Sequence, residues 1–354
     1  MIMASWTRTI GTILGVGLFS LHPSIVVAQW LPEARNAPTF PRNAPPPAPP
    51  RSQPQNERKG DRDFRVTALQ QDYTGDLWVG TWMGLTRINP NTGAIVARTS
   101  LPDYTLSSLT SDRSGRIWGG SYRGLVRVDP RSNELTAYSF RLPSNRILSL
   151  LIDNRGYLWA GTDRGIALIS PDRGFLMTTL QDLPGVSANA LTLDSEGQLW
   201  VGTLEGLVRI NTASAYPIGR MANLPGGIVQ ALATSPNETI WVGTIAGLLE
   251  IDPLQRRIIR SIPEFAGRSV TSIRFAQNGR VWVGTENGLY HLDAQTGKII
   301  GEIPDLPSSR ILSLSPDTGN KLWVGTSEGL AWISQTSGLV RPHLAFIRNP
   351  PNNY

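Results

Sequence analysis

The sequence predicts an all-β protein, a seven-bladed β-propeller with four antiparallel strands in each blade. The first observation behind this prediction is a repeat of about 41 residues, which is the length of one propeller blade. The second is the content of each repeat, in which short stretches of alternating apolar and polar residues are separated by glycine-containing turns. The repeat is marked by seven tryptophans, at Trp78, Trp118, Trp159, Trp200, Trp241, Trp282 and Trp323.

Each repeat is expected to contain four strands. Around Trp159, residues Ile147–Ile152 read as a first strand, Leu158–Gly161 as a second and Gly165–Ile169 as a third. A weaker fourth strand closes each repeat, as at Glu134–Phe140 in the preceding one. Short strands at regular spacing, without helical periodicity, favour a propeller over other all-β architectures.

The first and last repeats are predicted to begin and end in phase. Val66–Gln71 reads as the innermost strand of blade one, and Leu339–Ile347 as the outer strand of blade seven. Pro342 is tolerable in that strand because the outer edge is unpaired.

The turn before each tryptophan calls for a left-handed backbone conformation. The residue three positions before the tryptophan is glycine in five repeats, and Gly or Asn suits such a hairpin position. Asn320 fills it in blade seven, whereas blade five has Glu238 there, so we expect the neighbouring Asn237 to take the left-handed role.

Three further repeated positions have physical explanations. A glycine two residues after each tryptophan, such as Gly161, indicates close approach of another chain segment. The Thr or Ser that follows it can hold the next turn through its hydroxyl. An aspartate six residues before the tryptophan indicates turn chemistry, and it occurs at Asp72, Asp112, Asp153, Asp194 and Asp317.

The seven repeated tryptophans are interpreted as structural residues packed between neighbouring blades, each burying about 150–250 Å². The alternative is a ring of ligand-stacking tryptophans. Their recurrence at one strand position in every blade favours the structural interpretation.

The first 28 residues resemble a secretory signal peptide. Arg8 precedes an apolar run, Pro23 breaks it, and small residues end at Ala28, after which we expect cleavage. A retained membrane anchor is the alternative. The signal peptide predicts a periplasmic or secreted location. The chain has no cysteine, so it is not expected to be a lipoprotein or to contain disulfides.

Three other segments complete the expected domain organisation. Residues 29–64 are proline-rich and predict a disordered linker, either a spacer or a docking segment. The propeller is expected at 65–347 and a disordered tail at 348–354.

The net charge of +6 falls partly on residues before the propeller. Because this charge does not define one basic face, nucleic-acid binding is excluded. We also expect the protein to be a monomer.

Blade three carries a specific resemblance. Its residues 142–150 (LPSNRILSL) and 153–162 (DNRGYLWAGT), like residues 306–311 and 322–326 of blade seven, resemble repeats of the two-component regulator propeller family. The resemblance covers about residues 65–347. It implies a propeller of the kind found in extracytoplasmic sensor portions of histidine kinases, which often detect glycan fragments. No segment after Phe346 resembles a membrane span or a kinase, so a separate membrane histidine kinase is the signalling partner that the resemblance suggests.

A candidate binding site is expected on the crossover face, meaning the face that carries the turns between second and third strands and the crossovers between blades. Loops on this face vary while the framework repeats. Aromatic rings beside charged hydrogen-bonding groups suit a sugar or a partner loop. In blades one to three these candidates are Trp82, Tyr104, Tyr122, Arg123, Asp163 and Arg164. The alternative is that these side chains simply pack on neighbouring loops.

The sequence offers little for catalysis. After the leader only His291 and His343 remain; His291 is expected to be packed in a third strand and His343 to lie on the surface of an edge strand. No catalytic constellation, metal site or cofactor is expected. The predicted function is non-catalytic recognition of a glycan, peptide or protein. The alternatives are a periplasmic assembly scaffold for membrane protein complexes and a metal-dependent lyase or hydrolase of propeller type.

Overall fold

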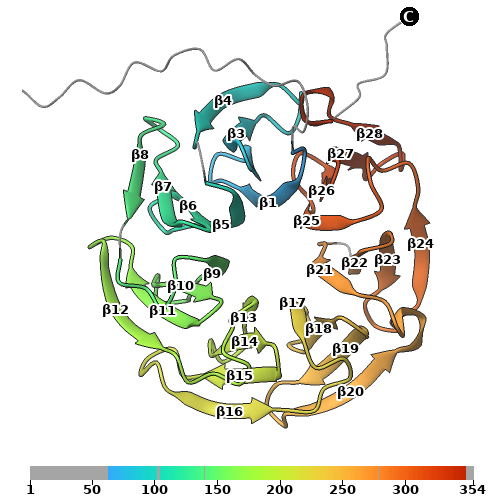
Figure 1. The fold of residues 1–354 in the computed structure, drawn as a ribbon. Coiled ribbons are helices and arrows are strands. Elements are labelled where there is room, and N and C mark those ends of the chain that lie inside the picture. Colours follow the sequence, from blue (N-terminus) through green and yellow to red (C-terminus); the bar gives the residue numbers. More distant parts are fainter. Residues whose placement is uncertain (1–62, 102–103, 139, 278, 348–354) are drawn as a thin grey trace, which may run out of the picture. The chain divides into compact units, whose positions relative to one another are not determined.

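The computed structural model describes residues 63–101, 104–138, 140–277 and 279–347. Across these residues, seven four-stranded antiparallel sheets form a ring around a central axis, which confirms the predicted propeller (Figure 1). Within each sheet the strands are paired in sequence order from the axis outward. The predicted leader, most of the proline-rich segment and the tail at 348–354 lie outside the described residues.

The first three blades have these bounds, from the innermost to the outermost strand. Blade one contains β1 (Val66–Gln71), β2 (Leu77–Thr81), β3 (Gly84–Ile88) and β4 (Ile95–Ser100); blade two contains β5 (Leu106–Ser111), β6 (Ile117–Ser121), β7 (Gly124–Val128) and β8 (Leu135–Tyr138); blade three contains β9 (Ile147–Ile152), β10 (Leu158–Thr162), β11 (Gly165–Ser170) and β12 (Phe175–Leu180).

The remaining blades follow the same order, with two short 3₁₀ helices. Blade four contains β13 (Ala190–Leu193), β14 (Leu199–Thr203), β15 (Gly206–Ile210) and β16 (Pro217–Met221); blade five contains β17 (Val229–Thr234), β18 (Ile240–Thr244), β19 (Gly247–Asp252) and β20 (Arg257–Ile262), followed by η1 (Pro263–Phe265); blade six contains β21 (Val270–Phe275), β22 (Arg280–Thr285), β23 (Leu289–Asp293) and β24 (Ile299–Ile303); blade seven contains β25 (Ile311–Ser315), β26 (Lys321–Thr326), β27 (Gly329–Ser334) and β28 (Val340–Pro342), followed by η2 (Leu344–Phe346).

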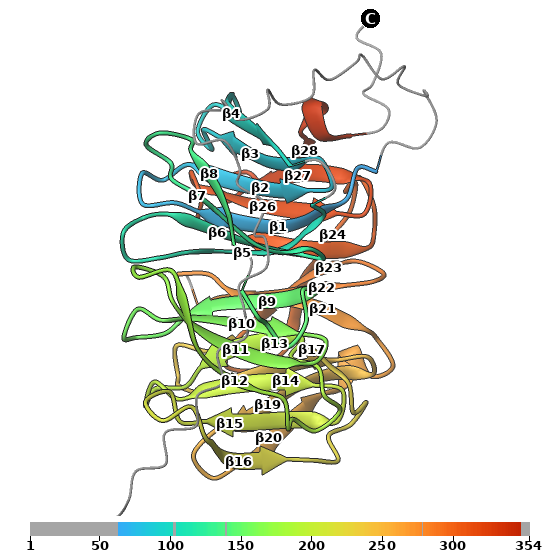
Figure 2. The ribbon, with the colours of Figure 1, turned by 60° about the vertical axis from the view of Figure 1, so that its left-hand side comes forward.

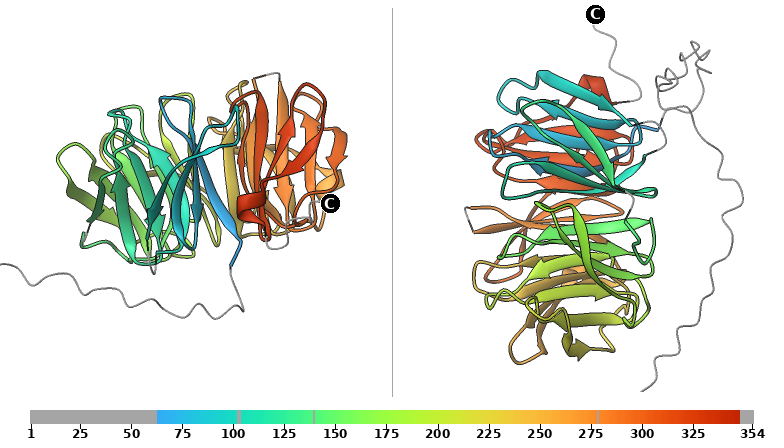
Figure 3. Two further views of the ribbon diagram at one scale, coloured as in Figure 1. Left: turned by 90° about the horizontal axis from the view of Figure 1, so that it is seen from above. Right: turned by 90° about the vertical axis from the view of Figure 1, so that its left-hand side faces the viewer.

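The blades stand side by side, so each sheet buries its faces against its neighbours (Figures 2 and 3). The second strand of a blade is covered on both faces, and β2, β6, β10, β14 and β18 are buried along their whole length. Six of the repeated tryptophans are fully buried, and Trp282 is 7% exposed. Trp78, for example, belongs to an apolar cluster with Leu106 and Ile117 of blade two.

A buried aspartate anchors the tryptophan in four blades. Asp194 accepts a hydrogen bond from the Nε1 of Trp200 at 2.9 Å and another from the backbone N–H of Gln198 at 2.9 Å. Asp72, Asp112 and Asp153 bond their tryptophans in the same way. In blade seven the arrangement differs, because Trp323 donates to the carbonyl of Thr318 instead of to Asp317. In four blades the aspartate therefore bonds the turn, as predicted, and also bonds a tryptophan in the core.

The left-handed turn position is found as predicted, with one correction. Blade five has its positive φ, 65°, at Glu238 itself, so the expectation that Asn237 replaces it was wrong. The turn closes through a hydrogen bond from the Glu238 N–H to Ser235 O at 3.0 Å, which fixes the position in the turn whatever residue occupies it. The conformation is less favourable for glutamate than for glycine.

The glycine after each tryptophan provides room for the next blade. A Cβ at Gly161 would lie 2.3 Å from the Oγ of Ser149 and 2.4 Å from the carbonyl oxygen of Ala188, which precedes the inner strand of blade four. At Gly325 a Cβ would lie 2.4 Å from the carbonyl oxygen of Val66. The last blade thus packs on the first as closely as consecutive blades pack on each other.

The outer strand of blade seven is shorter than the predicted Leu339–Ile347. β28 spans Val340–Pro342, and the chain then turns into η2. Proline has no N–H with which to continue the ladder. The following His343 N–H still bonds Leu330 O at 2.8 Å, and the Phe346 N–H returns to His343 O at 2.9 Å. The prediction that this segment pairs as the outer edge of blade seven is confirmed for β28.

Candidate functional site

On the crossover face, backbone hydrogen bonds join the crossovers between blades to the turns between second and third strands. The N–H of Asp163 donates to Arg146 O at 3.4 Å, and the N–H of Ser327 donates to Arg310 O at 3.1 Å. Variable turn tips are therefore held at fixed places around the ring.

The turn of blade one carries Trp82 and Met83 at its tip. The hydroxyl of Thr81 accepts a hydrogen bond from the Met83 N–H at 3.2 Å and donates to Gly84 O at 3.3 Å. At Gly84, where φ is 121°, a Cβ would meet the carbonyl oxygen of Thr99 at 2.3 Å. This tight turn leaves Trp82 36% and Met83 59% exposed.

Trp82 lines a groove, here named the blade-one groove, with a volume of 280 Å³. Its walls come from three parts of the chain that are far apart in sequence: the segment leading into β1, the turn and outer strand of blade one, and η2. Its lining is Asp63, Phe64, Trp82, Met83, Arg98, Thr99, Ser100, Ala345 and Phe346 together with 81 and 84–86. Aromatic and apolar side chains beside one arginine suit an amphipathic ligand.

Asp63, in the groove wall, forms an ion pair with Arg65. The guanidinium of Arg65 donates to both carboxylate oxygens of Asp63. This bonding raises the pKa of Arg65, to which the nearby phenol of Tyr122 also contributes. Burial acts to raise the pKa of Asp63, but the hydrogen bonds from Arg65 outweigh it and leave that pKa below its usual value. Both groups are therefore charged at neutral pH.

Tyr122 lies at the corresponding turn tip of blade two. It is 50% exposed, and the guanidinium of Arg146, from the crossover into blade three, lies 5.1 Å from the centre of its ring. Such a cation–π contact orients the ring while leaving part of it open to solvent. Arg146 thus contacts the ring of Tyr122, and Arg65 lies close to it. Neither arginine was among the predicted site residues.

The other predicted residues are distributed differently. Tyr104 packs against the apolar cluster of blades one and two. Arg123 and Arg164 are exposed, and their backbone N–H groups bond the hydroxyls of Ser121 and Thr162. The Oδ1 of Asp163 is buried without a hydrogen-bond partner among the described residues. Of the six predicted residues only Trp82 lines the blade-one groove.

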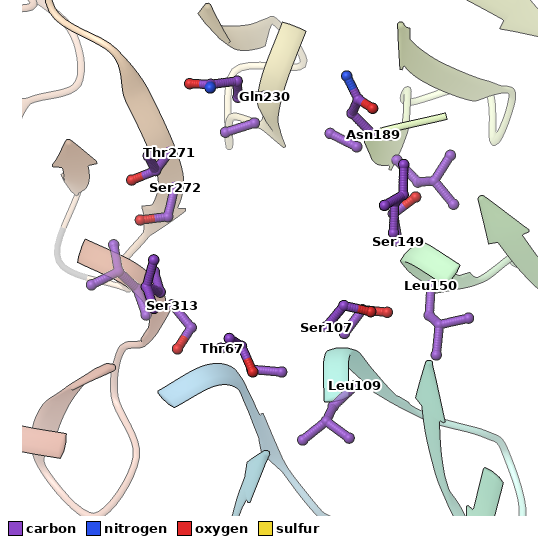
Figure 4. A pocket seen from close by; sticks show the side chains of 18 of the residues that line it. Thr67, Ser107, Leu109, Ser149, Leu150, Asn189, Gln230, Thr271, Ser272 and Ser313 are labelled. Carbon is purple, nitrogen blue, oxygen red and sulfur yellow. The ribbon is translucent and has the colours of Figure 1, made fainter. Parts of the chain in front are cut away.

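The axis of the propeller is a channel of 190 Å³ lined by the inner strands of all seven blades (Figure 4). Most of its polar side chains hold neighbouring blades together. In six junctions a side chain in or directly before the inner strand donates to a backbone carbonyl of the next blade, as from Ser107 Oγ to Ile147 O at 2.6 Å; in the seventh, Gln230 accepts from Ser269 Oγ at 2.9 Å. The other five donors are Thr67, Ser149, Asn189, Thr271 and Ser313.

The two histidines of the propeller serve packing contacts. His291 lies 4.9 Å from the Trp282 ring centre, and burial together with the nearby Arg280 lowers its pKa. His343 was expected on the surface of an edge strand; it is instead half-buried and bonds Gly93 O at 2.8 Å through Nε2. The described ranges contain no group of three or more His, Cys, Asp or Glu side chains able to hold a metal ion. They also contain no helix long and apolar enough to cross a membrane.

Comparison with solved structures supports the fold. The extracellular domains of two proteins described as hybrid two-component systems of B. thetaiotaomicron superpose with TM-scores of 0.66 and 0.65 at 20% and 21% identity, over 78% and 77% of this chain. The matched region is 40% of each of those domains, so this chain spans less than half of them. A streptogramin B lyase structure superposes with a TM-score of 0.66 at 14% identity, over 80% of this chain and 95% of the lyase.

Sequence comparison identifies the repeat. No curated protein matches the chain significantly. The family model described as two component regulator propeller matches residues 141–164, 182–205 and 264–287. Each match contains a crossover, the inner strand and the tryptophan strand of one blade, in blades three, four and six. The chain is therefore a seven-bladed β-propeller in which three blades match the repeat described as two component regulator propeller.

Proposed function

We propose that this protein is an exported, non-catalytic recognition propeller that binds a glycan or peptide in the blade-one groove. The observation that carries the proposal is the exposed ring of Trp82 in a groove that also contains Met83 and Arg98. Exposed apolar side chains with a charged group beside them can bind one face of a sugar or an extended peptide while orienting its polar groups.

The comparisons support export and a sensor-type role. Proteins with the same fold serve as extracellular domains of two-component systems, and the repeats here are of that family. The leader-like residues 1–28 and the lack of cysteine agree with an extracytoplasmic location without disulfides. A membrane histidine kinase is the partner that this role would require.

The test is a comparison of two exposed aromatic residues. Trp82→Ala should weaken binding in oligosaccharide and peptide panels by about 2 kcal/mol or more, because it removes the central aromatic contact. Tyr216→Ala is the matched control, since Tyr216 is 72% exposed and lies just before β16, in blade four. Both variants should unfold at nearly the wild-type temperature.

Two outcomes would contradict the proposal. One is a ligand whose affinity is the same for wild type and Trp82→Ala. The other is a large loss of stability in Trp82→Ala, which would identify Trp82 as a packing residue. A glycan or peptide that loses affinity only with Trp82→Ala supports the proposal and names the ligand class.

A further inference from the structure

The inner strand of blade six places an arginine in the axial channel. Arg274 lies on β21 and is paired in register with Trp282. At the same register the other six inner strands carry uncharged residues, namely Gln70, Thr110, Leu151, Thr192, Ala233 and Ser315. Of the residues that line the channel, Arg274 is the one with a charge. The channel therefore has a positive group and no lining carboxylate.

The bonding of Arg274 differs from that of several arginines in other blades. Arg116, Arg209 and Arg260, in blades two, four and five, each bond a carboxylate of this chain at 2.6–2.7 Å. Arg274 donates from Nη1 to the carbonyl of the adjacent Ile273 at 2.9 Å, and within the described residues it has no carboxylate partner. A guanidinium has five N–H donors, and the other four of Arg274 have no protein acceptor in the part of the chain that the structure describes.

Arg274 is an exposed residue of β21, and the inner strands enclose the channel that it lines. None of the other lining residues carries a charge, so no anion of the channel wall neutralises it. An arginine remains protonated in a protein, so Arg274 keeps its positive charge in the channel. An anion that enters the channel would gain the attraction of this charge and supply the missing partner.

We propose that the axial channel binds a small oxyanion, held by the guanidinium of Arg274. The fork of N–H donors in a guanidinium matches the paired oxygens of a carboxylate, phosphate or sulfate. A volume of 190 Å³ admits an ion or a small acid and excludes a folded partner. The amide of Gln230 also lines the channel, and its Nε2 has no acceptor in the described part of the chain, so it offers a further donor.

This channel site is separate from the blade-one groove. None of the groove residues lines the channel, and the channel is bounded by inner strands while the groove involves outer strand β4 and η2. Binding at one site can therefore fail without affecting the proposal for the other.

The experiment is calorimetric titration of the full exported chain, in a buffer free of inorganic oxyanions, with acetate, phosphate and sulfate in turn. We expect at least one of them to bind with a Kd of about 1 mM or lower. Arg274→Gln should weaken that binding at least about tenfold, because it removes the charge and the paired donors. Arg274→Lys should bind with intermediate affinity, since it keeps the charge and loses the fork.

Arg341→Gln is the matched control, because it removes one positive charge from the exposed strand β28, far from the inner strands (Figure 1). It should bind like wild type, which separates a local contact from a change in net charge. The identity of the oxyanion that binds distinguishes a carboxylic acid ligand from a phosphate or sulfate ligand. The proposal is overturned if none of the three binds to wild type, or if Arg274→Gln binds as well as wild type. Thermal unfolding of each variant confirms that it is folded.

Discussion

The aspartate that bonds the repeated tryptophan does more than shape a turn. The side chain of Asp194 is 0% exposed; it accepts from the Trp200 indole and lies 2.7 Å from a guanidinium nitrogen of Arg209, itself 12% exposed. A buried carboxylate of this kind is tolerated because each of its oxygens is bonded and a cation lies beside it. The repeat thus depends on a three-residue unit of aspartate, tryptophan and arginine in this blade.

Asp194→Asn is expected to destabilise the propeller by about 3 kcal/mol, because it leaves Arg209 partly unpaired and presents N–H donors to the indole N–H. Asp317→Asn is the control at the same repeat position. Asp317 bonds Gln335 Nε2 and the Gln277 N–H rather than its tryptophan. It should cost about 1 kcal/mol. Urea denaturation of the two variants measures the difference, and equal losses would contradict the role assigned to the unit.

His291 predicts a dependence of stability on pH. Its folded-state pKa is lowered by burial and by Arg280, so the unfolded chain binds the proton more tightly. Stability is therefore fully present above the unfolded pKa of about 6.5 and is lost as pH falls below it. His291→Phe keeps a ring against Trp282 and removes the titrating group. Between about pH 7 and pH 5, wild type should lose more stability than the variant, and parallel losses in denaturation curves would refute this assignment.

Residue identity alone could not locate every bond in this framework. The inner-strand donors that join the blades occur at one position in Thr67, Ser107 and Thr271, but one residue later in Ser149 and Ser313. The repeat therefore conserves the bond between blades while shifting the side chain that makes it. A sequence pattern based on fixed positions misses such an exchange, and it also misses Glu238, where turn geometry overrides residue preference.

At the scale of elements, the inner three strands of each blade were predictable because their faces are buried and their turns repeat. The outer strands were less so. Glu134–Phe140 was expected as one strand and β8 spans Leu135–Tyr138, since outer strands alternate between partly buried and exposed residues and their ends depend on neighbouring loops. The blade-one groove was not predictable as a unit. Its walls come from Phe64, Trp82 and Phe346, which only the closed ring brings together.

The close approach of blades predicts the effect of adding one methyl group. Gly161→Ala should destabilise by about 1–3 kcal/mol, because its Cβ would overlap Ser149 Oγ and Ala188 O and force the blades apart. Gly301→Ala is the control in a strand with room. Its Cβ would meet nothing nearer than the His291 ring at 3.5 Å, so stability should change by less than about 0.5 kcal/mol. Similar values from thermal unfolding would rule out tight interblade packing at Gly161.

At the scale of the whole propeller, the sequence period determines the blade count, but closure depends on contacts between its two ends. Blades one and seven each consist of four consecutive strands, so no strand is exchanged between them. Their junction is held by side chains instead. Ser313 donates to Val66 O at 3.0 Å, His343 bonds Gly93 O, and an apolar cluster includes Val66, Trp323 and Phe346.

Lys321 gives a test of this junction. Its Nζ donates to Pro90 O at 2.6 Å and to Asn91 O at 3.0 Å, in the turn between the outer strands of blade one. Arg260, in the outer strand of blade five, makes comparable contacts to Gln295 O at 2.8 Å and Ala294 O at 3.0 Å in blade six. These residues are 34 and 35 positions apart, against 230 and 231 for Lys321, so the Lys321 contact closes a much longer loop at greater entropic cost.

Lys321→Met should therefore accelerate hydrogen exchange in blades one and seven while leaving blades three to five protected, because the ring opens where the longest loop is closed. Arg260→Met is the control, with faster exchange expected only around blades five and six. Mass-spectrometric exchange of the two variants measures the comparison by blade. If Lys321→Met exchanges uniformly around the ring, or if wild type opens first at the junction of blades five and six, the ends are not the weakest junction. Closure would then depend on the apolar cluster of Val66, Trp323 and Phe346 rather than on the polar contacts that surround it.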